Sequence, residues 1–228
     1  MKHDNTPQPA ERSDDGGQPI RVLIVDDHEV LAASLARVLD EEPDMVSVGL
    51  ADSLAQARAR VTTAAPDVLL LDRRLPDGDG VAAIPELRAL RPSMNVVVLT
   101  AAVADNVLVQ AIEAGAAGFV SKTRGLSEVT AAVRAAAAGE SVISPEMLSR
   151  LLPKLSRSSG PEPDLTKREQ EVLSMLAQGL SNAAIAEKLT VSVHTVRNHI
   201  ANLSAKLGAH SKLEALSIAV RRGLYPGL

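Results

Sequence analysis

The residues of this chain that are best suited to chemistry stand at the ends of short apolar runs in its first half. Asp26 and Asp27 follow the run RVLIV, Asp72 follows VLLL, Thr100 follows VVVL, and Lys122 follows GFVS. Carboxylates that are brought together repel one another unless a cation lies between them. Three carboxylates therefore predict a site for a hard, oxygen-binding cation such as Mg²⁺, while the hydroxyl and the ammonium group predict binding of a phosphoryl group.

The runs that precede these residues are typical of strands in a parallel sheet covered on both faces. They are rich in Val, Leu and Ile, show no polar alternation, and are separated by helical patterns. Five strands alternating with five helices indicate a doubly wound α/β domain, whose ligands bind beyond the carboxyl ends of the strands. Pro85 predicts that the third helix is short or bent. We expect strands near Val22, near Val46 and at 68–71, 96–99 and 118–120, and helices at 29–39, 53–64, 81–90, 106–114 and 126–138.

Composition limits the class of protein. A chain of 228 residues with 46% hydrophobic residues is long enough for two domains with cores of their own. The absence of Cys excludes disulfides, thiolate metal sites and Cys nucleophiles. The first 19 residues are polar, and no apolar run approaches the roughly 18 residues that span a bilayer, so we expect a cytoplasmic protein without membrane contact.

Charge divides the chain into two halves of opposite sign. From Leu165 onward there are 8 Lys and Arg against 4 Asp and Glu, a net charge of +4, which leaves −8 for the rest of the chain. A basic module joined to an acidic one predicts a polyanion partner for the module. Phe119 and Tyr225 are the only aromatic residues, so the stacking platforms of single-strand binders are missing and duplex DNA is the better interpretation.

The boundaries of the expected domains follow composition. Pro, Gly, Gln and acidic residues without periodicity predict a disordered tail over 1–18. The segment SRLLPKLSRSSGPEPD, with three prolines, a Ser cluster and a Gly, is typical of a linker. We therefore expect the α/β domain at 19–141, a linker at 142–163, and a small all-α module at 164–228.

The C-terminal module shows a helix-turn-helix pattern. Thr166 with Glu169 predicts a capping box, Gly179 predicts the end of that helix, Ser181 or Asn182 begins the next, and Ser192 caps a third. In the third helix one face is predicted to be core. The opposite face carries residues that allow close approach to a major groove, but on this pattern alone an ordinary solvated helix face is the favoured alternative. The core stripe is Val193, Val196, Ile200, Leu203 and Leu207; the exposed face is His194, Thr195, Arg197, Asn198 and Ala201.

In its first half the chain resembles the receiver domain of two-component response regulators. The resemblance rests on the acidic pair after the first strand, Asp72 after the third, Thr100 after the fourth and Lys122 after the fifth. It implies that Asp72 is the phosphoacceptor and that Thr100 and Lys122 bind the phosphoryl oxygens. It further implies a Mg²⁺ site formed by the carboxylates of Asp26, Asp27 and Asp72 and the backbone carbonyl of Arg74. Phe119 matches a rotamer-switch position, with a plain core residue as the alternative.

One departure from the family concerns the residues after Asp72. Arg73 stands where an aliphatic or small residue is usual, and Arg74 follows it. A phosphatase of the haloacid dehalogenase type also uses a strand-end Asp, Mg²⁺, Thr and Lys, but it needs a second Asp at the position of Arg74. We therefore expect no enzyme beyond self-phosphorylation from a phosphodonor and autodephosphorylation, and we hypothesise that Arg74 slows hydrolysis of the acyl phosphate.

In its second half the chain resembles the LuxR-type domain of NarL/FixJ response regulators, through LTKRE, IAEKL, TVRNH and KLG. The resemblance implies DNA contacts by Arg197 and Asn198, with His194 and Thr195 nearby and Lys206 on a phosphate. The last helix, expected at 212–222, either helps to pair two modules on DNA or is only core.

Together the two resemblances imply a transcription regulator of a two-component system. A sensor histidine kinase phosphorylates Asp72, and the phosphorylated homodimer binds double-stranded promoter DNA, with RNA polymerase as a further candidate partner. The alternative is a DNA-binding regulator that works without phosphorylation. The sequence leaves open which kinase and which promoters are involved and whether the protein activates or represses. It also leaves open whether phosphorylation drives dimerisation or relieves inhibition by the receiver.

Overall fold

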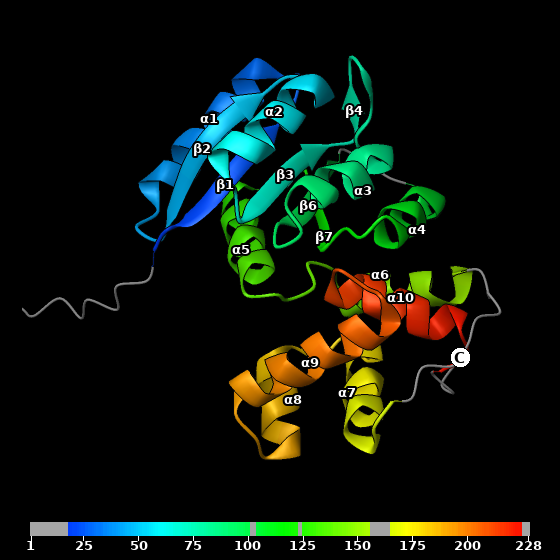
Figure 1. Cartoon of the computed structure of the whole chain (residues 1–228). Coiled ribbons are helices and arrows are strands. Elements are labelled where there is room, and N and C mark those ends of the chain that lie inside the picture. Colours follow the sequence, from blue (N-terminus) through cyan, green and yellow to red (C-terminus); the bar gives the residue numbers. More distant parts are fainter. Residues whose placement is uncertain (1–17, 101–103, 123–124, 156–164, 225–228) are drawn as a thin grey trace, which may run out of the picture.

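The computed structural model describes residues 18–100, 104–122, 125–155 and 165–224. The tail for which the sequence predicts disorder lies outside this part of the chain except for its last residue, and so do residues 156–163 of the expected linker. An α/β part lies above a helical part in Figure 1, and the chain passes from one to the other after helix α5.

The α/β part contains one five-stranded parallel sheet, as the sequence predicts. Its strand order is β2-β1-β3-β6-β7. Because the order changes direction at β1, the carboxyl ends of β1 and β3 flank a crevice in which ligands of doubly wound folds bind. The strands are β1 (Ile20–Val25), β2 (Met45–Ala51), β3 (Val68–Asp72), β6 (Asn95–Thr100) and β7 (Gly118–Ser121).

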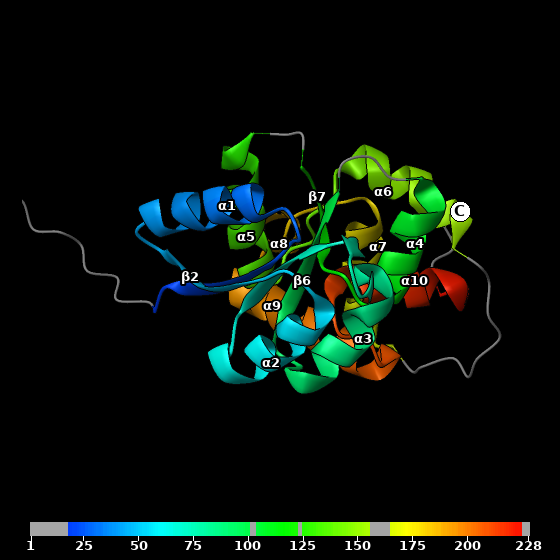
Figure 2. The same ribbon diagram turned by 90° about the horizontal axis from the view of Figure 1, so that it is seen from above.

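Helices cover both faces of the sheet (Figure 2). Helices α1 (Glu29–Glu41) and α5 (Leu126–Ala137) bury apolar residues against one face. Helices α2 (Leu54–Ala64), α3 (Gly80–Leu90) and α4 (Asp105–Glu113) cover the other. Burial on both faces explains why the sequences of β1, β3 and β6 contain continuous apolar runs.

Two features of this part add to the sequence prediction. Helix α3 continues through Pro85 over 11 residues, as long as α2, so it is not short, and the bend that the sequence gives as the alternative stays a prediction. A short antiparallel hairpin of β4 (Arg74–Leu75) and β5 (Gly78–Asp79) follows β3 and was not predicted, because two-residue strands leave no periodic signal.

The helical part consists of α6 (Pro145–Leu151), the 3₁₀ turn η1 (Leu152–Lys154), α7 (Lys167–Ala177), α8 (Asn182–Leu189), α9 (Val193–Leu207) and α10 (Lys212–Arg221). The helix starts predicted from sequence are confirmed. Thr166 and Glu169 form a capping box at α7, and the side chains of Ser181 and Ser192 cap α8 and α9. Helix α6 lies within the expected linker and was not predicted, although Ser144 followed by Pro145 is a typical helix start.

The packing of α9 confirms the predicted core stripe except at its first position. Val196, Ile200, Leu203 and Leu207 are buried, whereas Val193 is 38% exposed. Val193 is the first residue of the helix, where no preceding turn exists to cover it, so the prediction of a buried Val193 is wrong.

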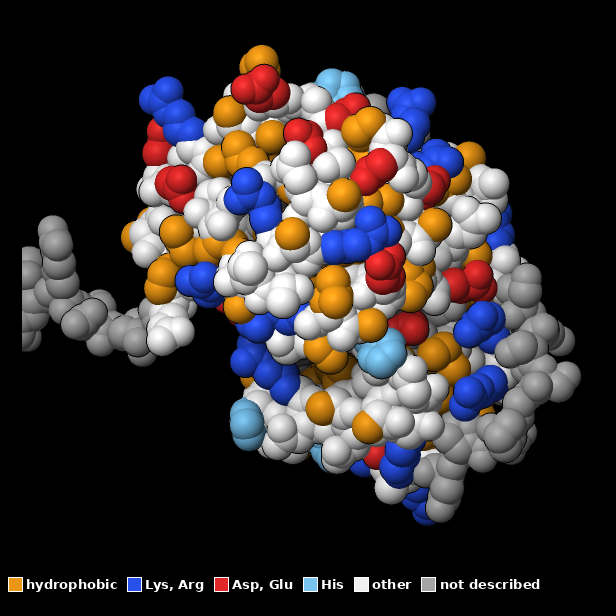
Figure 3. Space-filling model, turned by 45° about the horizontal axis from the view of Figure 1, so that its top comes forward, with side chains coloured by type: hydrophobic (Ala, Val, Ile, Leu, Met, Phe, Trp, Pro, Cys, Tyr) orange, Lys and Arg blue, Asp and Glu red, His pale blue; other side chains and the backbone are white. Residues whose placement is uncertain are grey.

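The two parts share one apolar core. Leu108 and Ile112 of α4 belong to the same buried cluster as Leu213 and Leu216 of α10. A hollow is visible at the junction of the two parts in the surface view (Figure 3).

Within the described residues, none of the helices has both the length and the hydropathy needed to cross a bilayer.

Candidate functional site

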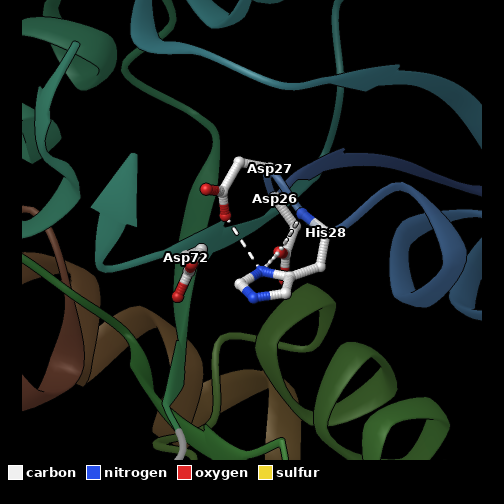
Figure 4. Close-up of side chains that lie close together, drawn as sticks. All are labelled: Asp26, Asp27, His28 and Asp72. Carbon is white, nitrogen blue, oxygen red and sulfur yellow. Dashed lines mark hydrogen bonds and ion pairs between the residues drawn. The ribbon is translucent and has the colours of Figure 1, made fainter. Parts of the chain in front are cut away.

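The carboxyl ends of β1 and β3 bring three acidic side chains together (Figure 4). Asp26 and Asp27 follow β1 directly, and Asp72 is the last residue of β3. Together with His28, each of these residues offers one ligand atom, and the four atoms lie within 4.8 Å of one another. The convergence that the sequence predicts for the three carboxylates is therefore present.

Lys122 balances the two buried carboxylates of this group. Its Nζ lies 2.6 Å from Asp26 Oδ2 and 3.0 Å from Asp72 Oδ2. The Asp26 side chain is fully buried and the Asp72 side chain is 8% exposed. Burial of two carboxylates at such short range is costly unless a cation is close, and the ammonium group meets that need. The Asp72 carboxylate is therefore largely covered on the side of Lys122.

Backbone amides hold the two buried carboxylates in place. Asp72 Oδ1 accepts a hydrogen bond of 2.8 Å from the amide of Arg73, and Asp26 Oδ1 accepts one of 2.9 Å from the amide of His28. One oxygen of each carboxylate is thus fixed by its own loop. The other oxygen of each carboxylate, Oδ2, faces the Lys122 ammonium group. A phosphoryl ligand would compete with these two oxygens for that group.

His28 is also part of the site. Its Nδ1 lies 2.9 Å from Asp26 Oδ1 and 2.9 Å from Asp27 Oδ1, and its side chain is 69% exposed. The imidazole bridges the acidic pair at the rim of the site. Its position directly after the pair is the signal that could have identified it.

The hairpin after Asp72 leads into a close backbone contact between Gly80 and the end of β3. Gly80 donates its amide to the Arg73 carbonyl at 2.6 Å, and a Cβ at Gly80 would lie 2.1 Å from the Asp72 carbonyl oxygen. Only glycine allows this approach. Arg74 is exposed on β4, while Arg73 Nε lies 3.4 Å from Asp79 Oδ2. The metal-ligand role of the Arg74 carbonyl stays a prediction.

Thr100 and Phe119 lie on a neighbouring cavity. Both are half-buried and line a cavity of about 590 Å³ that extends over α5 and the start of α6. The amide of Lys122 donates to the Thr100 carbonyl at 2.7 Å, so β6 and β7 place the hydroxyl and the ammonium group at one edge of the sheet. Phe119 is neither fully buried nor fully exposed, which leaves its switch role a prediction.

The donor set of the acidic site fits a hard divalent cation. Carboxylate oxygens are the ligands that Mg²⁺ prefers, and three of them meet here at short range. The residues that would hold the ion are Asp26, Asp27 and Asp72.

A second candidate site is the exposed face of α9. His194, Arg197, Asn198 and Ala201 are exposed, as the sequence predicts, and Thr195 is half-buried. Arg197 and Ala201 line a cavity at the junction with the α/β part. Lys206, for which the sequence predicts a phosphate contact, lies 2.8 Å from Glu169 Oε2 in the capping box of α7. It therefore has a structural partner within the module.

Comparison with known families accounts for both halves of the chain. Residues 22–134 match the response regulator receiver domain, and residues 163–219 match the luxR family of bacterial regulatory proteins. The chain belongs to the LuxR-type response regulators. Its α/β part is the receiver domain, and α7 to α10 form the LuxR-type DNA-binding domain.

Curated relatives share this two-domain organisation over nearly their full length. The response regulator is 36% identical over 213 residues to the DNA-binding transcriptional activator DevR/DosR of Mycobacterium tuberculosis, a match that covers 91% of this chain and 98% of the relative. It is 33% identical to the transcriptional regulatory protein LiaR of Bacillus subtilis, with 90% and 99% covered. The prediction of a two-component transcription regulator is thereby confirmed at the level of the family.

Solved structures confirm the fold. The receiver domain of the response regulator NarL from Mycobacterium tuberculosis is 31% identical, with a TM-score of 0.52, and its match covers 54% of this chain and 100% of that structure. A structure described as two RcsB dimers bound to two parallel DNAs is 26% identical, with a TM-score of 0.54 and coverage of 90% and 99%. The fold of the response regulator described here therefore agrees with solved structures of response regulators.

Proposed function

We propose that this response regulator is phosphorylated on Asp72 by a sensor histidine kinase in a Mg²⁺-dependent reaction, and that phosphorylation controls sequence-specific DNA binding and transcription. The observation that carries the proposal is the position of the Lys122 ammonium group, which touches the carboxylates of both Asp26 and Asp72. An ammonium group in this position can neutralise a phosphoryl group that arrives on Asp72.

The side chains of the site have separate tasks in this reaction. A carboxylate oxygen of Asp72 forms a bond to phosphorus while the bond from phosphorus to the kinase histidine nitrogen breaks, and the nitrogen leaves with its electron pair. Mg²⁺ held by the acidic group supplies charge neutralisation for the phosphoryl oxygens. Lys122 gives up its contact with Asp72 Oδ2 and binds a phosphoryl oxygen, and the Thr100 hydroxyl donates to another. The movement of these two side chains changes the surface formed by β6 and β7.

The output of this change is DNA binding by α9. The exposed His194, Arg197 and Asn198 and the half-buried Thr195 reach base edges or phosphates, and Lys206 contacts a phosphate. One small module offers few contacts, so the active form is a homodimer that binds two half-sites of promoter DNA in the cytoplasm. RNA polymerase is a further candidate partner.

The experiment that tests the proposal is footprinting across genomic DNA with wild type and Asp72→Ala, each with and without Mg²⁺ and a small phosphodonor. We expect new or stronger footprints only for wild type with both additions. Identical footprints in all four conditions would contradict the proposal and favour the alternative, a DNA-binding regulator that works without phosphorylation.

A further inference from the structure

The tip of the β4–β5 hairpin is held by the N-terminus of α2. Asp77 lies in the turn between the two strands, and its side chain is exposed. Its Oδ1 accepts a hydrogen bond of 2.8 Å from the amide of Leu54, and its Oδ2 accepts one of 2.9 Å from the amide of Ala55. These two residues are the first of α2. One carboxylate thus joins the loop that follows Asp72 to a helix that precedes it in the chain.

Asp77 takes the place of an ordinary helix cap. The N-cap residue of α2 is Ser53, but its hydroxyl donates to Asp52 Oδ1 at 2.8 Å, and its side chain makes no cap hydrogen bond among the described residues. The first amides of a helix need acceptors, and the positive partial charge there favours a carboxylate. These amides lower the pKa of Asp77, so its carboxyl group is ionised at neutral pH. Because the acceptor comes from a distant loop, the cap of α2 also fixes that loop.

Apolar packing supports the contact between the hairpin and α2. Leu75 of β4 and Leu54 of α2 are both buried and belong to one apolar cluster. A Cβ at Gly78 would lie 2.9 Å from Leu54 Cδ1, so β5 approaches this side chain as closely as glycine allows. The tip of the hairpin therefore has a defined position against α2.

The other end of the hairpin is fixed at α3. The Asp79 side chain caps α3 by accepting a hydrogen bond of 2.8 Å from the amide of Val81, and the Gly80 amide donates to the Arg73 carbonyl at 2.6 Å. Arg74 pairs with Asp79 in the hairpin and lies between this base and the tip. A two-residue ladder held only at its base can pivot, whereas a second anchor at the tip fixes the backbone of Arg74.

We propose that Asp77 is a positioning residue for the metal site, and that its bonds to α2 hold the backbone carbonyl of Arg74 where this carbonyl joins the acidic side chains as a ligand of Mg²⁺. The proposal deepens the Mg²⁺-dependent reaction proposed above and rests on it. Mg²⁺ demands near-ideal octahedral geometry, so a ligand that is free to move costs affinity. By linkage, an anchor that strengthens metal binding is itself strengthened by the metal to the same extent. The N-terminus of α2 therefore responds to occupation of a site to which it contributes no ligand.

The first test measures Mg²⁺ binding by isothermal titration of the full-length, unphosphorylated protein. Asp77→Asn and Asp77→Ala both remove the charge, but asparagine keeps one accepting oxygen and alanine keeps none. We expect Asp77→Ala to bind Mg²⁺ roughly 3- to 10-fold more weakly than wild type, at or below the lower end of what loss of a direct partner of a metal ligand costs. Asp77→Asn should lie between the two. An equal loss for both variants would assign the effect to charge and overturn the positioning role.

Glu86→Gln is the matched control. Glu86 also holds α2 through two hydrogen bonds, which Arg58 donates at 2.7 and 2.9 Å, but it lies on α3 and not on the hairpin. The substitution removes a charge of the same sign and loosens the same helix, so it should change the Mg²⁺ affinity by less than about 2-fold. A loss as large as that of Asp77→Ala would show that the affinity depends on any contact of α2, which contradicts the proposal.

Amide hydrogen exchange provides a readout that a merely structural contact would not move. Saturating Mg²⁺ should slow exchange of the Leu54 and Ala55 amides in wild type by the factor found for Asp77→Ala, roughly 3- to 10-fold. The Ser47 amide, which donates to Asp40 Oδ1 at 2.7 Å, is the internal control and should not respond. Unchanged exchange at α2 in protein that binds Mg²⁺ overturns the coupling alone. A wild type that binds no Mg²⁺ contradicts the Mg²⁺-dependent reaction and, with it, this inference.

Discussion

At the scale of single residues, the ammonium group of Lys122 offsets part of the negative charge of the acidic site. It stands between the two buried carboxylates, 2.6 Å from Asp26 and 3.0 Å from Asp72. A divalent cation that binds the same carboxylates meets the repulsion of this group, so Lys122→Met should bind Mg²⁺ roughly 3- to 10-fold more tightly than wild type, a change of about 1 kcal/mol for one nearby charge. Isothermal titration measures it. Arg73→Gln, which removes a charge paired with Asp79 at 3.4 Å, is the control and should change the affinity by less than about 2-fold. Weaker Mg²⁺ binding by Lys122→Met would contradict this account of the charge balance.

Arg74 is the residue next to the site whose role is least constrained by contacts. It is exposed on β4 and directly follows Arg73, whose amide donates a hydrogen bond to Asp72 Oδ1. If its bulk and charge hinder the approach of water to the acyl phosphate, Arg74→Asn should shorten the lifetime of phosphorylated protein several-fold. The decay of radiolabelled protein measures this lifetime. Equal lifetimes for wild type and Arg74→Asn would show that the side chain only faces solvent.

The junction of β3 and α3 depends on Gly80. A methyl group at this position would lie 2.1 Å from the carbonyl oxygen of Asp72, which is a backbone atom that cannot turn away. Gly80→Ala should therefore lower the free energy of unfolding by about 2 kcal/mol and weaken Mg²⁺ binding, although alanine favours a helix elsewhere. Denaturant unfolding checks the first effect. At Gly125 the nearest atom to an added Cβ is 3.7 Å away, so Gly125→Ala should cost less than about 1 kcal/mol. Equal stability of the two variants would contradict the steric argument.

At the scale of elements, Glu169 of α7 and Lys206 of α9 form an ion pair that joins the two helices. The sequence predicts a helix cap for Glu169 and a phosphate contact for Lys206. Burial raises the pKa of Glu169, but the contacts with Lys206 and Thr166 outweigh burial and lower it. A carboxyl whose pKa is lower in the folded state adds stability above its unfolded pKa of about 4.3, and this stability is lost as the pH falls through the folded pKa.

Lys206→Ala should lower the free energy of unfolding by about 1 kcal/mol at pH 7, and the difference from wild type should shrink below about pH 4. Arg37→Ala removes an exposed pair with Glu41 and should cost less than about 0.5 kcal/mol at either pH. The same Lys206→Ala protein tests the predicted phosphate contact, which requires a salt slope of DNA binding that is flatter by about 1. An unchanged slope together with the loss of stability would make Lys206 a residue of the α7–α9 contact only.

Elements with a strong local signal could be predicted from the sequence, and those without one could not. Strands β1, β3 and β6 contain continuous apolar runs, and the caps at Thr166, Ser181 and Ser192 follow from short-range hydrogen-bond chemistry, so both were predictable. The β4–β5 hairpin and the contact of His28 with the acidic pair depend on how the loops after β3 and β1 fold back, and no periodic pattern records that. The domain junction is also absent from the sequence pattern, because Glu140 and Asn182 are 42 positions apart and meet only through tertiary packing.

At the scale of the whole molecule, Arg88 fastens the receiver to the DNA-binding domain. Its side chain donates to the carbonyls of Gly115 at 3.0 Å and His210 at 2.7 Å, and the residue is 5% exposed. Burial lowers the pKa of Arg88, while the nearby Glu214 opposes the shift. This buried guanidinium group binds one carbonyl of each domain. The two domains can therefore separate only if it loses a hydrogen bond.

Arg88→Met should therefore favour an open arrangement of the two domains by about 1–3 kcal/mol, because methionine keeps the apolar stem and leaves both carbonyls without their donor. Small-angle scattering should give a larger radius of gyration for the unphosphorylated variant than for wild type, and calorimetry should separate the melting of the two domains. Arg21→Met is the control, since Arg21 makes the same kind of contacts, to the carbonyls of Ala64 and Ala65, but within the receiver. A wild-type radius for Arg88→Met would mean that the apolar contact of α4 with α10 holds the domains together without the guanidinium group.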